Sequence, residues 1–343
     1  MLILIPTGIL FVFSIFNLIG IKPALVPVQL LFLVISAVGF FLLRRIGLAF
    51  FRQNAKLFYW IFVSLLVLTY IIGFEARGSK RWIDLHFFNF QPSEFFKIFF
   101  VLFFADYFSA LKKDSDEVGV FFKSLFYFAL PTFIIFKQPD LGSALVYACI
   151  YFTLLFFSYI PKKTILTFFA ALGLVLPFGW FILHDYQKNR ILSFINPHID
   201  SMGTGYNMLQ AVITTGSGKF FGRGLGHGTQ TKLSFLPENH TDFAFSSLIE
   251  QFGFVGGFLV LGCYFAIVAI LVRKILETIS KQNKNDYFNA LFLTGFLAYF
   301  VFQLSVNISM NLGLFPVTGI TLPLISYGGS SLAGIMISLA LLP

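Results

Sequence analysis

The sequence from Asp242 to Val272 reads DFAFSSLIEQFGFVGGFLVLGCYFAIVAILV. Beyond Glu250 it contains no Asp, Glu, Lys or Arg, and about 20 such residues in a helix cross a bilayer. A carboxylate at the edge of a membrane span is costly unless another group pairs with it or uses it. The stretch therefore predicts a membrane helix and makes Asp242 the first candidate for chemistry.

The whole chain has the same apolar character. It is 57% hydrophobic and 11% charged, with 50 Phe among 343 residues, and a soluble protein of this length has too little interior to bury so much apolar surface. We therefore expect an all-α polytopic integral membrane protein that forms a single membrane domain over residues 1–343. Cys149 and Cys263 lie in apolar runs, which favours buried thiols over a disulfide or a metal site.

About ten apolar segments have the length of transmembrane helices. They lie near residues 2–19, 27–48, 56–73, 92–109, 119–136, 141–159, 164–183, 242–272, 287–310 and 321–342. Lys and Arg concentrate in alternate short loops, which are therefore cytoplasmic, together with both termini. The same rule accounts for the net charge of +9, so nucleic acid is not an expected partner.

The remaining loops are then extracytoplasmic, and most of the unusual polar residues fall in or beside them. The longest of these loops, residues 184–241, lies between the seventh and eighth helices. It is rich in Gly between residues 203 and 228, and glycines let a backbone approach a ligand closely while successive amides bind an anion. The alternative is a plain re-entrant or surface loop, although its length and aromatic content argue against disorder.

Residues 91–97 form a polar cluster where the fourth apolar segment begins. Pro92 suits the first turn of a helix, and Gln91 or Ser93 is a candidate cap. Glu94 and Lys97 are three residues apart and share one helix face. They form either an internal ion pair that satisfies two buried charges or a pair in which Glu94 orients Lys97 towards a phosphate, and both interpretations can hold together.

Three further polar groups have both a structural and a functional interpretation. Arg81 beside Trp82 favours an anchor at the lipid headgroups over a substrate contact. Asp140, between Pro139 and Gly142, favours an N-cap at the start of a short helix. Pro and paired Gly in residues 319–331 predict a broken helix that lines a cavity, which Asn307 and Asn311 would face.

Four sequence blocks occur in a fixed order. They are RWI and QPSE with a following Lys in residues 81–97, QPDLG at 138–142, LPE and HTDF in 236–243, and PVTG and LPLISYGGSS in 316–331. In these blocks the chain resembles the SEDS family, which comprises RodA, FtsW and their sporulation relative. Residues 206–207 and 228–230 look closer to RodA than to FtsW. In one departure, Gln251 follows Glu250 where the family more often has a second acid.

The resemblance implies a peptidoglycan glycosyltransferase that polymerises lipid II during cell-wall elongation by an inverting reaction that forms a β-1,4 bond. It implies a multi-pass protein of the bacterial inner or plasma membrane with an extracytoplasmic active site. It also implies a class B penicillin-binding protein, a transpeptidase, as partner. By motif, Asp242 takes the position of the essential catalytic acid, and Glu94 and Lys97 take those of a supporting polar pair.

On this hypothesis Asp242 is the general base that deprotonates the 4-hydroxyl of the acceptor sugar. If Thr241 caps the eighth helix, Asp242 lies in its first turn. The diphosphate of the lipid carrier requires cations, and the candidates are Lys97, Arg190, Arg223 and a divalent ion, Mg²⁺ or Mn²⁺, held at Asp242. Asp140 and Ser326 complete the candidate site residues, and no organic cofactor is expected.

Two other classes of protein suit the same sequence. A lipid II flippase would also use intramembrane charges and broken helices, but its polar residues should extend towards both faces of the membrane. A non-catalytic scaffold of the cell-wall machinery would leave the polar residues at positions 94, 97 and 242 without a role.

Overall fold

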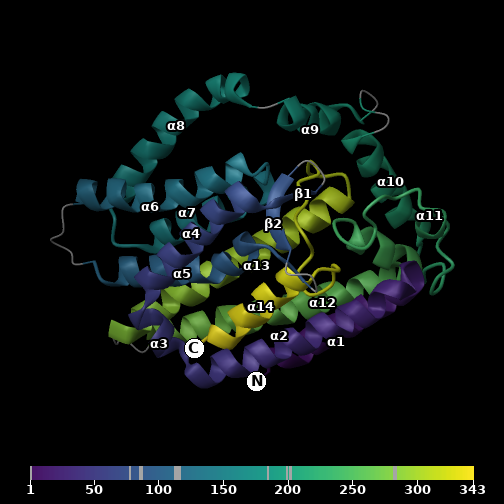
Figure 1. Cartoon of the computed structure of the whole chain (residues 1–343), viewed down its shortest axis with the longest axis horizontal. Coiled ribbons are helices and arrows are strands. Elements are labelled where there is room, and N and C mark those ends of the chain that lie inside the picture. The colour runs from purple at the N-terminus through teal and green to yellow at the C-terminus, as the bar shows by residue number, and fades with distance from the viewer. Residues whose placement is uncertain are drawn as a thin grey trace. The chain divides into compact units, whose positions relative to one another are not determined.

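Helices make up most of the computed structural model, which describes residues 2–76, 79–84, 88–111, 117–183, 185–197, 200, 203–280 and 284–343 (Figure 1). The helices are α1 (Leu4–Ile21), α2 (Val26–Ile46), α3 (Leu48–Gln53), α4 (Ala55–Ile72), α5 (Pro92–Ser109), α6 (Glu117–Lys137), α7 (Leu141–Phe157), α8 (Lys162–Ile182), α9 (Asp185–Ile195), α10 (Thr204–Ser217), α11 (Thr229–Lys232), α12 (Ala244–Ser280), α13 (Lys284–Asn311) and α14 (Gly329–Leu341). Each predicted apolar segment therefore contains a helix.

Six helices within the described residues are long and apolar enough to cross a membrane. They are α1, α2 with the 3₁₀ turn Pro23–Leu25 before it, α4, α6, α12 and most of α13. α7 and α14 are apolar but shorter. Long apolar helices that expose Leu, Ile and Phe side chains need a lipid environment, so the chain is a multi-pass membrane protein.

The expectation of an all-α fold is wrong for the loop before α5. This loop contains the strands β1 (Phe74–Ala76), β2 (Ser79–Asp84) and β3 (Asn89–Phe90), which form an antiparallel sheet in the order β1-β2-β3. Backbone that leaves a helix must still pair its N–H and C=O groups, and short antiparallel strands do this locally. β2 packs against α4 and α5, and β3 packs against α14, so the sheet contacts three helices of the chain.

The predicted loop 184–241 is partly helical, since it contains α9, α10 and α11. Residues 219–224 of its Gly-rich part form backbone hydrogen bonds with α12 where that helix is interrupted at Gly253, whose φ is +67°. Across this break the N–H of Arg223 donates to the carbonyl oxygen of Glu250 at 2.8 Å, and that of Phe254 donates to Lys219 at 2.9 Å. A Cβ on Gly222 would clash with the backbone of α12. Glycine at residue 222 thus permits close approach to the protein's own helix.

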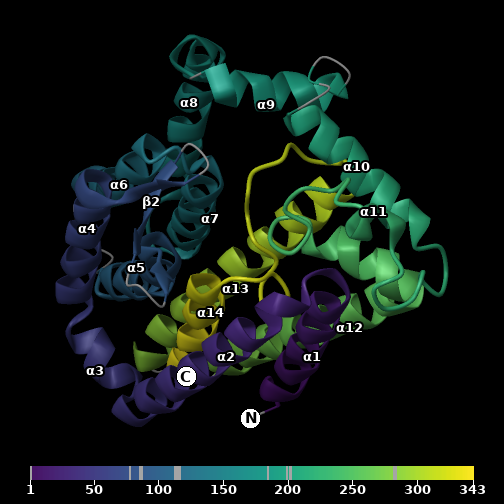
Figure 2. The ribbon, with the colours of Figure 1, turned by 45° about the vertical axis from the view of Figure 1, so that its right-hand side comes forward.

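Contacts between Cα atoms divide the chain into two compact units. The first comprises Met1–Leu31, Ala171–Ile270 and Gln303–Gly328, and the second comprises Phe32–Ala170, Leu271–Phe302 and Gly329–Pro343. In the second unit α5 packs against α4, α7 and α14, and Figure 2 shows α4 to α7 as one group. The side chains of α5 from Phe96 to Ala105 are all buried, which makes this helix the core of its unit.

Asp200 in the first unit holds the start of α10. Its carboxylate accepts hydrogen bonds from the N–H groups of Gly203 at 2.9 Å and Thr204 at 2.7 Å, and from the Thr204 hydroxyl at 3.1 Å. Burial by itself would raise the pKa of the Asp200 carboxyl, but these hydrogen bonds bring the pKa below its ordinary value. The N–H groups of a first helical turn have no partner within the helix, so this carboxylate caps α10.

Replacing Asp200 by Ala is expected to destabilise the first turn of α10 by about 1 kcal/mol, because its N–H groups lose their acceptor. In the native chain the stabilisation is complete above the unfolded pKa of about 3.9 and is lost as the pH falls through the lower folded value. Hydrogen exchange of residues 203–208 measures both effects. Unchanged exchange in the Asp200→Ala variant at neutral pH would contradict the assigned cap.

Candidate functional site

Asp242 lies in a segment whose backbone is fixed from outside. The carbonyl oxygen of His240 accepts from the N–H of Tyr327 at 2.8 Å, and that of Thr241 accepts from the Ser326 hydroxyl at 2.5 Å. Ser326 and Tyr327 belong to the irregular chain between α13 and α14, where the sequence predicts a broken helix, and α14 begins at Gly329. The two motifs that contain Asp242 and Ser326 are therefore adjacent in the first unit.

The side chain of Asp242 is half-buried and lies against that same irregular chain. A Cβ on Gly319 would be 3.7 Å from Oδ2 of Asp242, so the backbone of Gly319 lies beside the carboxylate. Gly319 has φ of +73°, a conformation that side chains disfavour. Because α12 begins at Ala244, Thr241 is not its cap, and Asp242 precedes the first turn of the helix.

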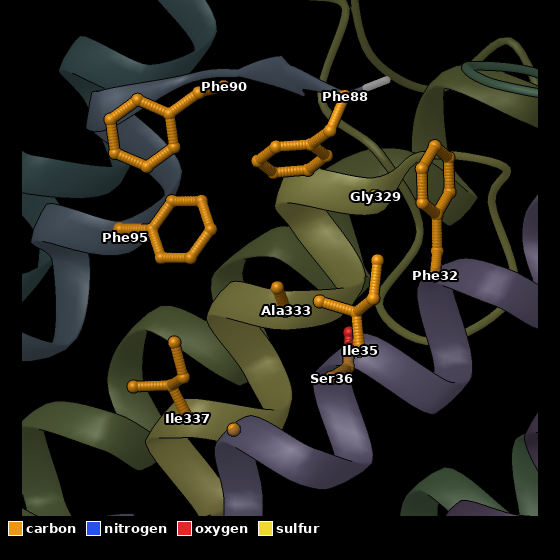
Figure 3. Close-up of a pocket in the computed structure, with 10 residues that line it drawn as sticks. Phe32, Ile35, Ser36, Phe88, Phe90, Phe95, Gly329, Ala333 and Ile337 are labelled. Atoms are coloured by element: carbon orange, nitrogen blue, oxygen red, sulfur yellow. The ribbon is translucent and has the colours of Figure 1, made fainter. Parts of the chain in front are cut away.

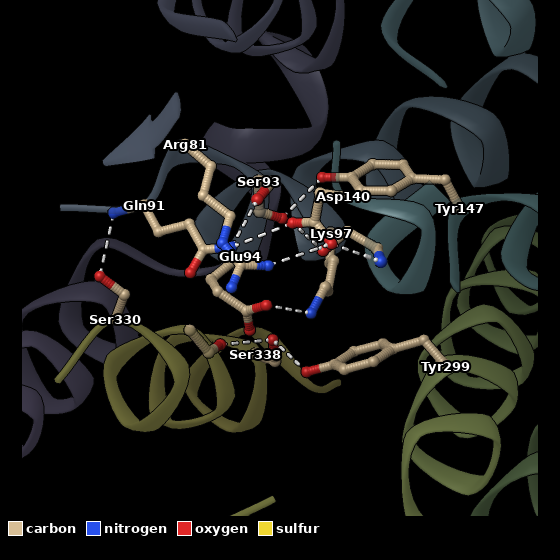
Figure 4. Close-up of polar contacts among 12 residues, drawn as sticks. Arg81, Gln91, Ser93, Glu94, Lys97, Asp140, Tyr147, Tyr299, Ser330 and Ser338 are labelled. Carbon is tan, nitrogen blue, oxygen red and sulfur yellow. Dashed lines mark hydrogen bonds and ion pairs between the residues drawn. The ribbon is translucent and has the colours of Figure 1, made fainter. Parts of the chain in front are cut away.

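The second unit contains the predicted ion pair. Nζ of Lys97 lies 2.6 Å from Oε1 of Glu94, and their side chains are 3% and 12% exposed. Both belong to α5, three residues apart on one face, as the sequence predicts. Figure 4 shows the two side chains beside α14. A Cβ on Gly334 of α14 would lie 3.0 Å from the carbonyl oxygen of Glu94, so the two helices are close together here.

Asp140 is the N-cap of α7, as predicted, and its side chain accepts from the N–H of Ser143 at 3.0 Å. It is 3% exposed and also accepts from Nε2 of Gln91 at 3.3 Å. Nη1 of Arg81 lies 3.5 Å from Oδ1 of Asp140. The guanidinium of Arg81 thus compensates the charge of the buried Asp140 carboxylate (Figure 4). Without this cation, burial of the carboxylate would be strongly destabilising.

Two expectations for this region need correction. Gln91 is the N-cap residue of α5, but its side chain makes no capping bond and donates to Ser93 at 3.1 Å and to Asp140. Arg81 was expected at the lipid headgroups beside Trp82, and its guanidinium does lie 4.3 Å from that ring. Its ion pair with Asp140 was missed, although a buried acid after Pro139 was a signal that a cation must lie nearby.

Two buried tyrosines, which the sequence did not single out, line the same network. The hydroxyl of Tyr147 in α7 donates to the carbonyl oxygen of Ser93 at 2.7 Å. The hydroxyl of Tyr299 in α13 lies 3.0 Å from Oγ of Ser338 in α14 (Figure 4). They connect α7 to α5 and α13 to α14, and the first of these bonds helps to fix the helix that carries the Glu94–Lys97 pair.

The two predicted arginines of loop 184–241 belong to the first unit. Arg190 is half-buried in α9, and Arg223 is exposed. Nε of Arg223 donates to the carbonyl oxygen of Ser217 at 2.8 Å, so this side chain supports the Gly-rich segment. Asp242, Ser326 and these arginines belong to the first unit, whereas Glu94, Lys97 and Asp140 belong to the second.

Glu250 has a structural role that the sequence did not reveal. Its fully buried carboxylate accepts from the N–H groups of Gln230 at 2.8 Å and Thr231 at 3.0 Å, in the first turn of α11. The next residue, Gln251, donates through Nε2 to Oδ1 of Asn17 at 2.7 Å and accepts from the N–H of Gly226 at 3.2 Å. An acid at position 251 would have no N–H to donate, so an amide fits this contact.

A metal site built by protein side chains is not found in the described residues, where no three His, Cys, Asp or Glu side chains converge. Mg²⁺ is commonly held by one carboxylate together with substrate phosphates. The single carboxylate of Asp242 would suit that pattern, since it is half-buried and lies at a backbone turn outside the helix.

The fold and these groups define a class: a multi-pass helical membrane protein with buried charges in its helical core. Residues 2–343 match the family of cell cycle proteins that comprises FtsW, RodA and SpoVE. The chain is 37% identical over 318 residues to the probable peptidoglycan glycosyltransferase FtsW of Acinetobacter baylyi, covering 89% of this chain and 76% of that protein.

It is 36% identical over 313 residues to the peptidoglycan glycosyltransferase MrdB of Helicobacter pylori, with 89% and 80% covered. A solved structure from a peptidoglycan synthase complex that coordinates polymerization and crosslinking matches with a TM-score of 0.83 at 28% identity. That match covers 98% of this chain and 94% of the other. The chain belongs to the FtsW, RodA and SpoVE family, which is the SEDS family.

Proposed function

We propose that this protein is a peptidoglycan glycosyltransferase that polymerises lipid II, a disaccharide-pentapeptide on undecaprenyl diphosphate, into glycan strands. Two relatives from different branches of the family, FtsW and MrdB, both carry the name of this activity. The resemblance of residues 206–207 and 228–230 to RodA supports a role in cell-wall elongation. These similarities support the reaction class, and the geometry of the second unit supports the substrate class.

The observation that carries the substrate class is an apolar pocket partly lined by α5, the helix that also holds the buried ion pair. The pocket has a volume of about 270 Å³ and lies between α2, α5 and α14 (Figure 3). Its walls include Phe32 and Ile35 of α2, Phe95 of α5 and Ala333 of α14. Phe95 follows Glu94, and Ala333 precedes Gly334, which packs against the backbone of Glu94.

α5 therefore supplies both a part of the apolar wall, through Phe95, and the charged pair of Glu94 and Lys97. A ligand that occupies both must be an amphiphile with an apolar chain and an anionic head, which is the chemistry of a lipid-linked sugar diphosphate. The pocket would take part of the isoprenoid chain by burial of apolar surface. Lys97 would contribute a cation to the diphosphate, together with Arg81, whose buried Nε has no hydrogen-bond partner in the described part of the chain.

In the proposed reaction the carboxylate of Asp242 accepts the proton of the acceptor's 4-hydroxyl. The resulting oxygen attacks C1 of the donor sugar and forms the glycosidic bond. The bond from C1 to the diphosphate oxygen breaks at the same time, and the lipid diphosphate leaves with the electron pair. Direct displacement inverts the configuration, so an α-linked donor gives a β-1,4 bond. A Mg²⁺ or Mn²⁺ ion held by Asp242 and the substrate would neutralise charge on the diphosphate.

The proposed topology has ten spans, both termini in the cytoplasm, and loop 184–241 and the active site outside. The alternation of basic loops supports it.

A class B penicillin-binding protein is the proposed partner, supported by the similarity to a chain of a complex that coordinates polymerization with crosslinking. Polymerisation outside the membrane would deliver strands on the side where the transpeptidase acts.

The test is glycan synthesis from lipid II in detergent, by the purified chain alone and with its partner. Product without any membrane to cross is expected, whereas transport in vesicles without polymerisation in detergent would favour a flippase. Replacing Ala333 by Phe should fill the pocket and raise KM for lipid II about tenfold, with less effect on an analogue that carries a short isoprenoid.

Val38→Phe is the matched control for the pocket variant, because residue 38 lies next to pocket residue Gly39 in α2 but is 54% exposed. It adds a ring of similar size outside the pocket and should leave KM unchanged. Equal KM values for both variants, or the same effect on long and short isoprenoids, would show that the pocket does not bind the lipid chain.

A further inference from the structure

Two buried amides of α13 hold the backbone of Asp242. Nδ2 of Asn307 donates to the carbonyl oxygen of Asp242 at 3.0 Å, and Nδ2 of Asn311 donates to the same oxygen at 3.1 Å. Both side chains are fully buried, and they lie one helical turn apart on one face. Burial of two polar amides is costly unless their donors and acceptors are satisfied, so this arrangement is specific.

Asn311 also holds the start of α12. Its Oδ1 accepts from the N–H of Ser246 at 3.0 Å and from the Ser246 hydroxyl at 2.7 Å. Ser246 lies in the first turn of α12, where N–H groups have no partner within the helix. One side chain therefore binds the carbonyl just before the helix and an N–H just inside it. This fixes where Asp242 lies relative to the helix axis.

Asn307 connects Asp242 to the chain on the other side of its carboxylate. Its Nδ2 also donates to the carbonyl oxygen of Ile320 at 2.7 Å. Ile320 follows Gly319, the residue whose backbone lies beside Oδ2 of Asp242. Asn307 thus sets the separation between the peptide that carries the carboxylate and the peptide that faces it.

We propose that Asn307 and Asn311 are positioning residues that hold the Asp242 carboxylate in the orientation needed for proton transfer. This inference rests on the proposed function, in which Asp242 is the general base. Both amides bond to the backbone carbonyl oxygen of Asp242 and neither bonds to its carboxylate, so they act on the position of the residue. A displacement of a reacting group by about 1 Å costs about 100-fold in rate, so loss of either amide should act on kcat.

The test compares Asn307→Leu with Asn17→Leu in the full-length protein with its partner. Leu has nearly the size of Asn but no donor. Asn17 is a matched control because it is also buried and its Nδ2 donates to the carbonyl oxygen of Ala244 at 3.2 Å, two residues beyond Asp242. Both variants should lose thermal stability, whereas only Asn307→Leu should lower kcat, by about 10–100-fold, with KM for lipid II unchanged.

Asn311→Asp is a second variant that keeps size and an oxygen for Ser246 but removes the donor to Asp242. A decrease in kcat by about tenfold or more is expected for it as well. If Asn307→Leu does not fold, this variant alone decides the inference. A kcat equal to that of Asn17→Leu, in whichever α13 variant folds, would overturn the positioning role.

Asp242→Ala separates this inference from the proposed function. If Asp242 is the base, Asp242→Ala is nearly inactive, and adding Asn307→Leu to it lowers the residual rate no further, because the two residues act through one group. Normal polymerisation by Asp242→Ala would refute the base assignment itself. An inactive Asp242→Ala together with equal kcat values for Asn307→Leu and Asn17→Leu would refute the positioning role alone.

Discussion

Asp242→Asn is expected to lower the rate of glycan polymerisation from lipid II about 10²–10⁴-fold, the usual contribution of a general base. Asn has the size and shape of Asp but cannot take up a proton. The backbone bonds that fix residues 240–242 come from Tyr327, Ser326 and two asparagines of α13, so they survive the substitution. The fold should therefore persist while the chemistry is lost.

Initial rates at saturating lipid II, with thermal unfolding measured on the same samples, check this prediction. Glu238→Gln is the control, because Glu238 is a half-buried acid four residues away whose Oε2 accepts from the Thr241 hydroxyl at 2.8 Å. Gln keeps an acceptor for that bond, so this variant should stay active. Near-normal polymerisation by folded Asp242→Asn would exclude the carboxylate as the base.

Lys97→Met should destabilise the protein by about 3–5 kcal/mol and remove its activity, because it leaves the carboxylate of Glu94 without its cation in a buried site. The side chains of Lys97 and Glu94 are only 3% and 12% exposed, so water cannot replace the lost partner. Activity should fall further than stability alone explains, since the diphosphate also loses a positive charge. Thermal unfolding in detergent and polymerisation rates measure the two effects separately.

The double variant Glu94→Gln with Lys97→Met distinguishes a structural pair from a functional one. With both charges removed, the free energy of unfolding should recover most of the loss, because no unpaired charge remains buried. The polymerisation rate should stay low, because the cation is still absent. If both the free energy of unfolding and the polymerisation rate recover, the two charges serve only to neutralise each other and do not bind substrate.

Much of the local structure could be predicted from the sequence. The Glu94–Lys97 pair follows from helical spacing, and the cap by Asp140 follows from its position before an apolar run. Both depend on residues within one or two turns of one helix. The failures are of the opposite kind: Arg81 reaches Asp140 from 59 positions earlier in the chain, and Glu250 holds a turn some 20 residues before it.

The Gly-rich segment shows why such contacts escaped prediction. Its glycines are consistent with a backbone that binds a ligand, but in the structure Gly222 packs closely against the backbone of α12 at the break near Gly253. A Gly-rich composition indicates that the backbone approaches another group closely. Whether that group is a ligand or the protein's own helix depends on the path of the chain in three dimensions. The small sheet before α5 was missed because each of its strands is short, between 2 and 6 residues.

For this protein, the sequence by itself determined the membrane class, the family and the identity of the candidate base, because apolar length and motif order are local properties of the chain. Only the tertiary structure decided what holds that base. Asn307 and Asn311 lie 65 and 69 positions from Asp242, and hydrogen bonds across such separations leave no periodic signal in the sequence. They depend on how α13 packs against the start of α12, which folding of the whole unit establishes.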